Sequence, residues 1–169
     1  MKIDLERPEL SASGYRFALI VSRWNGEFTS RLEAGAREAL SKAGAVDGNV
    51  EAFRVPGAFE LPLAALTAAR TGRFDAVIAL GVVIRGETPH FDYVAGEAAT
   101  GLRQASMETG IPVLFGVITA DTVEQTLARC ADGEDNKGYE AAMSAIDMVN
   151  ALNEIRRDRE NVKAFPNVV

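Results

Sequence analysis

The chain has 169 residues, of which 47% are hydrophobic and 25% are charged, and its formal net charge is −6 at pH 7. The length and hydrophobic fraction suit one domain with a sizeable core, and an acidic chain without a block of basic residues excludes a nucleic-acid or membrane-surface binder. One cysteine excludes a disulfide framework, and with a single histidine it cannot form a zinc site without carboxylates, so no metal is expected.

Residues 1–14 are polar and include Pro8 and Gly14, which predicts an N-terminal arm. The arm lacks the apolar stretch of a signal peptide, and no apolar run in the chain approaches membrane-spanning length. We therefore expect a soluble, cytoplasmic protein with no membrane partner. Its single domain is expected over residues 15–158, and residues 159–169 are expected to form a C-terminal tail.

From Tyr15 onward, short apolar runs alternate with segments of helical periodicity. In chain order, the predicted elements are strand 15–22, helix 28–43, strand 50–55, helix 59–70, strand 75–84, helix 91–109, strand 111–119, helix 121–130 and helix 139–157. Asp121 or Thr122 is the expected N-cap of the short helix, and Glu124 is expected to complete a capping box. An acidic loop, ADGEDNKG, precedes the last helix.

Near-continuous apolar strands that alternate with helices are typical of a parallel sheet covered on both faces. Right-handed crossovers then leave few topologies. We predict an α/β fold of the flavodoxin-like kind, a three-layer α/β/α sandwich with a four-stranded parallel sheet in the order 2-1-3-4. Ligands of such sheets bind beyond the carboxyl ends of the strands, so residues that follow the strands are candidate site residues.

The first two strand ends carry an aromatic side chain, an amide and a carboxylate. Trp24 could stack on a flat ligand and Asn25 could hydrogen-bond its edge, although Trp24 could equally pack under a loop. Glu60, after the second strand, could accept hydrogen bonds from a polyol. Its simpler interpretation is a first-turn carboxylate that interacts with a helix dipole.

The third strand leads into the sequence RGETPH, which ends on the only histidine of the chain, His90. The backbone N–H groups of residues 86–88 and the Thr88 hydroxyl could hold an anion, although no glycine-rich phosphate motif is present. A lone histidine is often an ordinary surface or core residue. Beside an aromatic, polar side chains and an anion site, it is a candidate proton carrier.

Five segments extend this interpretation to the whole chain: SRWN, VPGAFELP, ALGVVIRGETPHFDYV, FGVITADTVEQTLAR and NKGYEAAMSAIDM. In this order they resemble the lumazine synthase family from Tyr15 to the last helix. The resemblance implies a transferase of riboflavin biosynthesis that condenses 5-amino-6-(D-ribitylamino)uracil with 3,4-dihydroxy-2-butanone 4-phosphate to 6,7-dimethyl-8-ribityllumazine. It implies no cofactor, because the amine substrate is itself the nucleophile.

The resemblance also implies roles for particular residues, with His90 as the proton shuttle. The residues implied to bind the pyrimidine and ribityl groups are Trp24, Asn25, Gly57, Ala58, Glu60, Val82, Val83, Ile84, Phe115 and Lys137. Those implied to bind phosphate are Glu87, Thr88 and Arg129. Phe115, Arg129 and Lys137 would come from the neighbouring subunit of a homopentamer. Some family members assemble further, and a functional association with riboflavin synthase is also implied.

Two features depart from the family pattern. Glu87 stands beside the phosphate where many members have a small residue, so we expect its side chain to face solvent. The acidic loop replaces a Gly/Lys-rich turn of many shell-forming members, which, together with Pro8, leaves the higher assembly open. The alternative function is a flavodoxin-like flavin-binding module or electron carrier without synthase turnover. That alternative leaves His90 and Arg129 without a role.

Overall fold

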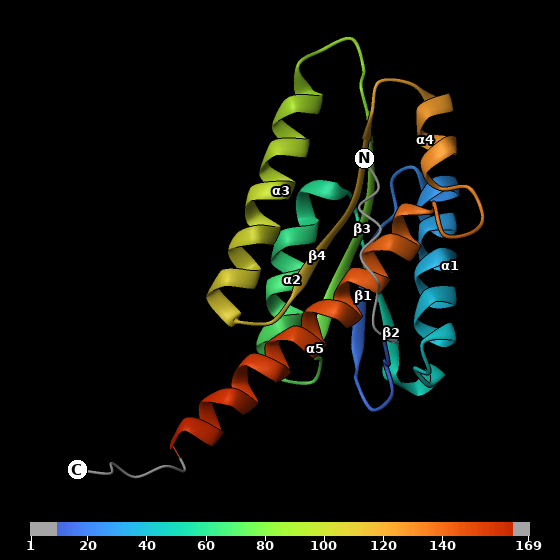
Figure 1. Cartoon of the computed structure of the whole chain (residues 1–169). Helices are drawn as coiled ribbons and strands as arrows, with labels where there is room; N and C mark the ends of the chain where they lie inside the picture. Colours follow the sequence, from blue (N-terminus) through green and yellow to red (C-terminus); the bar gives the residue numbers. More distant parts are fainter. Residues whose placement is uncertain (1–9, 164–169) are drawn as a thin grey trace.

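The middle layer of the molecule is a sheet of four parallel strands, seen in a computed structural model that describes residues 10–163 and the side chains of residues 10–157. The strands are β1 (Phe17–Ser22), β2 (Val50–Val55), β3 (Ala76–Ile84) and β4 (Val113–Ala120). Their order is β2-β1-β3-β4, and all three pairings are parallel. The predicted α/β sandwich and strand order are confirmed (Figure 1).

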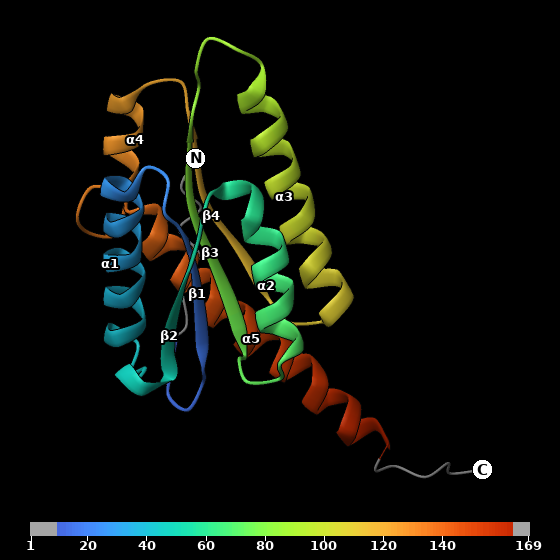
Figure 2. The same ribbon diagram turned by 180° about the vertical axis from the view of Figure 1, so that it is seen from behind.

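Helices cover both faces of the sheet. One face is covered by α1 (Gly26–Lys42), α4 (Val123–Arg129) and α5 (Lys137–Lys163), and the other by α2 (Leu61–Arg70) and α3 (His90–Thr109) (Figures 1 and 2). Two short 3-10 helices, η1 (Asp47–Asn49) and η2 (Ala58–Glu60), flank β2. The helix predicted after β2 therefore begins as η2 and continues as α2.

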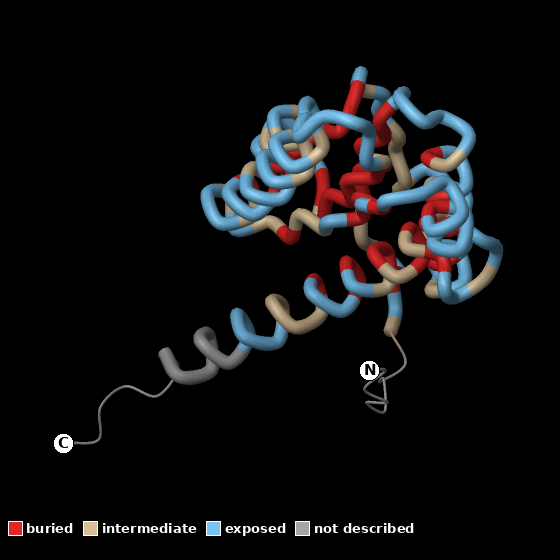
Figure 3. Tube along the Cα trace, turned by 90° about the horizontal axis from the view of Figure 1, so that it is seen from above, coloured by how far each residue is buried: buried red, intermediate tan, exposed pale blue. Residues whose placement is uncertain are grey.

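The sheet separates two hydrophobic cores, and alternate residues of β3 face each one. Ile78 and Leu80 pack in the core under α1 and α5, whereas Val77 and Ala79 pack in the core under α2 and α3. Figure 3 shows the buried residues gathered between the layers, with the outer helix faces exposed. Burial on both faces explains why β1 and β3 are continuous apolar runs without polar alternation.

Helices α4 and α5 differ from the sequence prediction at their ends. Thr122 is the N-cap of α4 and accepts a hydrogen bond from the Gln125 backbone N–H, while Gln125 Oε1 accepts from the Asp121 N–H. Because the helix begins at Val123, the third helical residue is Gln125, and the prediction that Glu124 completes the capping box is wrong. The last helix starts earlier than predicted and continues to Lys163, with its end projecting from the sheet (Figures 1 and 3).

The described part of the predicted arm packs against the domain. Ala12 is fully buried in the α1 and α5 core, and its N–H donates to the Ala43 carbonyl at 2.8 Å. Residues 1–9, with Pro8, and residues 164–169 lie outside the described residues. Within the described chain, no helix combines the length and apolar character needed to cross a membrane.

Candidate active site at the carboxyl ends of the strands

Asn25 holds together the ends of β1 and β3. Its backbone adopts the left-handed conformation (φ 59°), which asparagine tolerates better than most residues, and its carbonyl accepts from the N–H groups of Phe28 and Thr29. Its side-chain Nδ2 donates to the Val82 carbonyl at 2.9 Å. The amide nitrogen therefore has a structural partner, and the amide oxygen is the group that Asn25 can offer to a ligand.

Trp24, Gly57 and Glu60 meet where β1 and β2 end. The Trp24 N–H donates to the Pro56 carbonyl, and Glu60 Oε2 accepts the Gly57 N–H at 2.9 Å. A Cβ atom added at Gly57 would lie 3.2 Å from Glu60 Oε2 and 3.5 Å from Trp24 Cε3, so glycine allows this close approach. Trp24 is 68% exposed, which leaves apolar ring surface beside a carboxylate.

The third strand end brings His90 to the same edge of the sheet. His90 is the first residue of α3 and is exposed, and its side chain makes no hydrogen bond to another described residue. Glu87 and Thr88 precede it and are exposed, as expected for Glu87. The N–H groups of the first turn of α3 have no partners within the helix, and they and the helix dipole favour an anion there.

The remaining β3 candidates face different directions. Val82 packs in the core under α1 and α5 and Val83 in the core under α2 and α3, while Ile84 is only half-buried. Because neighbouring strand residues point to opposite faces, the side chains of Val82 and Val83 cannot line one face of the same ring. The Val82 carbonyl accepts the hydrogen bond from the Asn25 side chain and so helps to position Asn25. Ala58, in η2, is also buried.

Phe115, Lys137 and Arg129 lie away from this edge. Phe115 and Lys137 line a separate pocket of about 170 Å³ between β4 and α5, where Lys137 Nζ pairs with Glu140 at 2.6 Å. Phe115 is five residues before the end of β4, about 17 Å along the strand. Arg129 is the last residue of α4, about 10 Å along that helix from its start, and donates to Gln125 of its own helix.

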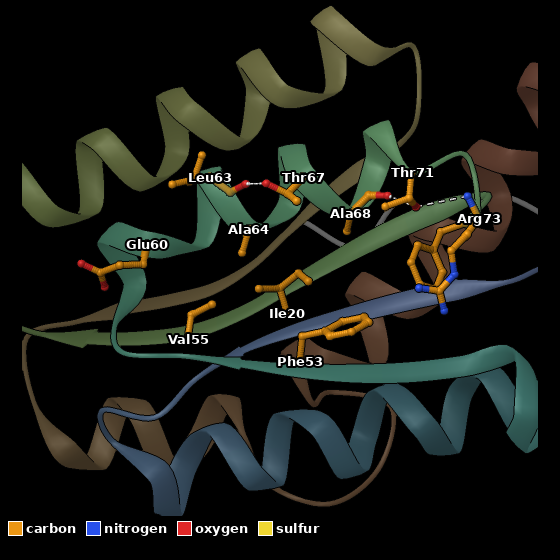
Figure 4. Close-up of a pocket in the computed structure, with 11 residues that line it drawn as sticks. Ile20, Phe53, Val55, Glu60, Leu63, Ala64, Thr67, Ala68, Thr71 and Arg73 are labelled. Carbon is orange, nitrogen blue, oxygen red and sulfur yellow. Dashed lines mark hydrogen bonds between the residues drawn. The ribbon is translucent and has the colours of Figure 1, made fainter.

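An apolar groove of about 410 Å³ lies between β2 and α2 (Figure 4). Glu60 lies at one end and Arg73 at the other, with aromatic and aliphatic side chains such as Phe53 between them. Among the predicted site residues, only Glu60 lines it. The groove therefore does not contain the candidate chemistry. Among the described residues, no group of three His, Cys, Asp or Glu side chains is arranged to hold a metal ion.

Sequence interpretation gave no role to two residues that organise the site. Arg85 directly follows β3 and hydrogen-bonds both Asp92 and Asp121, contacts that raise the pKa of its guanidinium, with Asp92 the larger cause. Asn136 is buried, and its Oδ1 accepts the N–H groups of Gly138 and Tyr139, so it caps the helix that presents Lys137. An asparagine just before an apolar-periodic segment is the signal that could have identified this cap.

An exposed aromatic ring, a carboxylate and an imidazole at the carboxyl edge of a parallel sheet define a small-molecule enzyme of the α/β class. Comparison with known proteins gives the particular family. The 6,7-dimethyl-8-ribityllumazine synthase family profile matches residues 14–153, so the chain belongs to that family. The predicted resemblance is thus confirmed: the chain is a transferase of riboflavin biosynthesis.

Two curated relatives support this assignment. The 6,7-dimethyl-8-ribityllumazine synthase of Desulfatibacillum aliphaticivorans is 50% identical over 147 residues, which cover 87% of this chain and 95% of the relative. The protein of the same name from Syntrophus aciditrophicus (strain SB) is 51% identical over 146 residues, covering 86% and 95% respectively. The similarity therefore extends over nearly the full length of both relatives.

Proposed function

We propose that the protein condenses 5-amino-6-(D-ribitylamino)uracil with 3,4-dihydroxy-2-butanone 4-phosphate to give 6,7-dimethyl-8-ribityllumazine, phosphate and water. The amine attacks the ketone, the carbinolamine loses water to form an imine, phosphate is eliminated, and ring closure follows. The observation that carries the proposal is the meeting of Trp24 and Glu60 over Gly57 at the edge where His90 begins α3. Family membership supports the same chemistry.

The amine substrate binds at the ends of β1 and β2. Its pyrimidine stacks on the exposed Trp24 indole, and Glu60 accepts hydrogen bonds from the ribityl hydroxyls. The Asn25 amide oxygen and the Gly57–Ala58 backbone bind the same chain. Val83 and Ile84 lie along the ring, and because their side chains point to opposite faces of the sheet, only one of them meets the ring through its side chain and the other through its backbone. These contacts act by holding the amine at a fixed distance from the second substrate, which supplies much of the rate of a two-substrate reaction.

His90 carries the protons. Carbinolamine dehydration and the enolisation that precedes phosphate loss each require proton transfer near neutral pH, and imidazole is the side chain whose ordinary pKa suits that task. The Thr88 hydroxyl, the Glu87 backbone and the first turn of α3 bind the phosphate next to His90. Glu87 is exposed, which supports the expectation that its carboxylate faces solvent instead of the anion.

Phe115, Lys137 and Arg129 complete the site of an adjacent copy of the chain. Phe115 is about 17 Å along β4 from the end of that strand, Arg129 is about 10 Å along α4 from its start, and Lys137 lines the same pocket as Phe115, which supports a role in a neighbouring site. A head-to-tail contact between identical subunits brings the two sets of residues together and closes into a ring, a pentamer by family resemblance. Arg129 then supplies the planar cation that pairs with phosphate oxygens.

The direct test mixes purified protein with both substrates and follows the fluorescence of the lumazine together with phosphate release. We expect equal amounts of lumazine and phosphate, and neither product when the ketone phosphate is omitted. Tight binding of FMN with reversible reduction, and no lumazine, would contradict the proposal and support a flavin-binding module instead.

A further inference from the structure

Arg85 connects three parts of the edge that carries His90. Its backbone N–H donates to the Ala120 carbonyl at 2.9 Å, at the point where β3 and β4 end. Its guanidinium donates to both carboxylate oxygens of Asp92, at 3.3 and 3.1 Å, and to Asp121 Oδ1 at 2.8 Å. It also lies over the Phe91 ring, 4.1 Å from the centroid.

The loop between Arg85 and His90 has few other attachments. Gly86, Glu87 and Thr88 form no hydrogen bond with any other described residue, and Pro89 accepts only the Asp92 N–H. Asp92 lies in the first turn of α3, two residues after His90. Because a helical turn is rigid, fixing Asp92 also fixes the backbone of His90 and the open N–H groups beside it.

We propose that Arg85 is a positioning residue that sets the place of His90 by holding the first turn of α3 against the ends of β3 and β4. The proposal rests on the proton-carrying role of His90 given above. The hydrogen bond to Asp121 fixes the guanidinium against the β4–α4 loop. The two hydrogen bonds to Asp92 then fix the first turn of α3 relative to that loop. Both loops leave the same end of the sheet (Figures 1 and 2).

The exposure of the three side chains determines what their contact can do. The exposed fraction of the side chain is 42% for Arg85, 59% for Asp92 and 64% for Asp121. Ion pairs that are this accessible contribute little to folding stability. The planar guanidinium binds with directional, two-pronged geometry, which a point charge cannot reproduce. The consequence of losing Arg85 is therefore a displaced His90 in a folded protein.

The experiment compares Arg85→Met, His90→Ala and the double variant in the lumazine assay, with assembly and melting temperature measured for each. We expect Arg85→Met to lower kcat about tenfold to a hundredfold, because misplacement by about 1 Å has an effect of that order. KM for the amine should change less than about threefold, whereas KM for the ketone phosphate should rise, because the N–H groups proposed to bind the phosphate lie in the same turn. Adding Arg85→Met to His90→Ala should cost little further activity, since Arg85 acts through His90. Arg85→Lys should recover part of the loss.

Arg73→Met is the matched control. Arg73 also hydrogen-bonds both oxygens of a carboxylate, that of Glu51, through its Nη2, and lies 5.0 Å from the centroid of the Phe74 ring, but it is near the opposite end of the sheet. We expect it to retain wild-type kcat.

The outcomes separate the two proposals. If His90→Ala is impaired but Arg85→Met retains wild-type kcat, or if the two losses multiply in the double variant, the positioning role is wrong and the function of His90 stands. If His90→Ala is fully active, both roles are wrong. If the wild-type protein forms no lumazine at all, the proposed reaction itself is wrong.

Discussion

His90 begins a long helix at the edge of the sheet, where an exposed imidazole supports little packing. His90→Ala should therefore lower kcat by about 100-fold, the usual contribution of one general acid–base group. The free energy of unfolding should change by less than about 0.5 kcal/mol, as for other surface substitutions. Steady-state lumazine formation and urea unfolding measure the two effects. A variant with unchanged turnover would show that His90 is an ordinary surface residue.

Arg129 tests the phosphate contact separately. Only one of the two substrates carries an anion, so Arg129→Ala should raise KM for the ketone phosphate by about tenfold or more and leave KM for the amine nearly unchanged. Arg129→Lys keeps the positive charge but not the planar guanidinium, so its KM for the ketone phosphate should lie between those of the wild type and Arg129→Ala. The measurement varies each substrate at a saturating concentration of the other. Equal increases in both KM values would contradict the phosphate role.

At the level of single residues, the sequence predicts groups whose chemistry is rare and whose place follows from a strand end. Trp24, Glu60 and His90 meet both conditions. Arg85 meets the second, but its function depends on Asp121, which lies 36 positions further along the chain. Strand alternation predicts that the side chains of Val82 and Val83 point to opposite faces of the sheet, although family resemblance places both residues beside the substrate.

Among the elements, α5 starts in closer contact with α1 than its sequence indicates. A Cβ atom at Gly138 would lie 1.9 Å from the Leu32 carbonyl oxygen and 2.9 Å from the Leu32 Cα. Asn136, 2% exposed, fixes the same turn through hydrogen bonds to the Arg31 and Ala131 carbonyls. This packing holds Lys137 in place, so the backbone of α5 cannot shift without moving the residue proposed to face the neighbouring site.

Gly138→Ala should therefore destabilise the fold by about 3 kcal/mol, because backbone must move to admit a methyl group. Gly26→Ala is the control: it also lies in the first turn of a helix, but nothing is within 4 Å of its added Cβ. That variant should be neutral or stabilised by up to about 1 kcal/mol. Urea unfolding of the wild type and the two variants at the same protein concentration measures these changes in the free energy of unfolding. Similar midpoints for both variants would contradict the close contact.

The elements themselves could be predicted to different degrees. The strands match closely because each apolar run is bounded by turn-forming or polar residues. The last helix is predicted to end at residue 157, already beyond the end of its apolar stripe near Leu152, whereas α5 continues to Lys163. Residues 154–157 are exposed, and they include Glu and Arg residues that favour helix without needing core contact. Periodicity detects only the packed part of a helix.

For the whole molecule, the distribution of the candidate site residues supports the proposed assembly. Trp24 is 68% exposed and Phe115 46%, and they lie on different elements, one just after β1 and one on the edge strand β4. Large exposed aromatic groups at two separate places are typical of surfaces that meet a partner. In the proposed assembly the two sets meet between neighbouring copies of the chain, a contact that sequence patterning within one chain cannot reveal.

The proposed shared site has a quantitative consequence. In a head-to-tail ring, His90→Ala and Arg129→Ala each damage every site, but a mixed ring contains sites in which both donors are intact. When the two variants are unfolded together in equal amounts and refolded, the His90 donor is intact in half of the sites and the Arg129 donor independently in half. About a quarter of the wild-type activity should therefore return, well above either variant refolded separately. Native mass spectrometry of differently labelled subunits verifies mixing. If thoroughly mixed rings show only the average activity of the two parents, His90 and Arg129 act within one chain, and the ring-shared site is wrong.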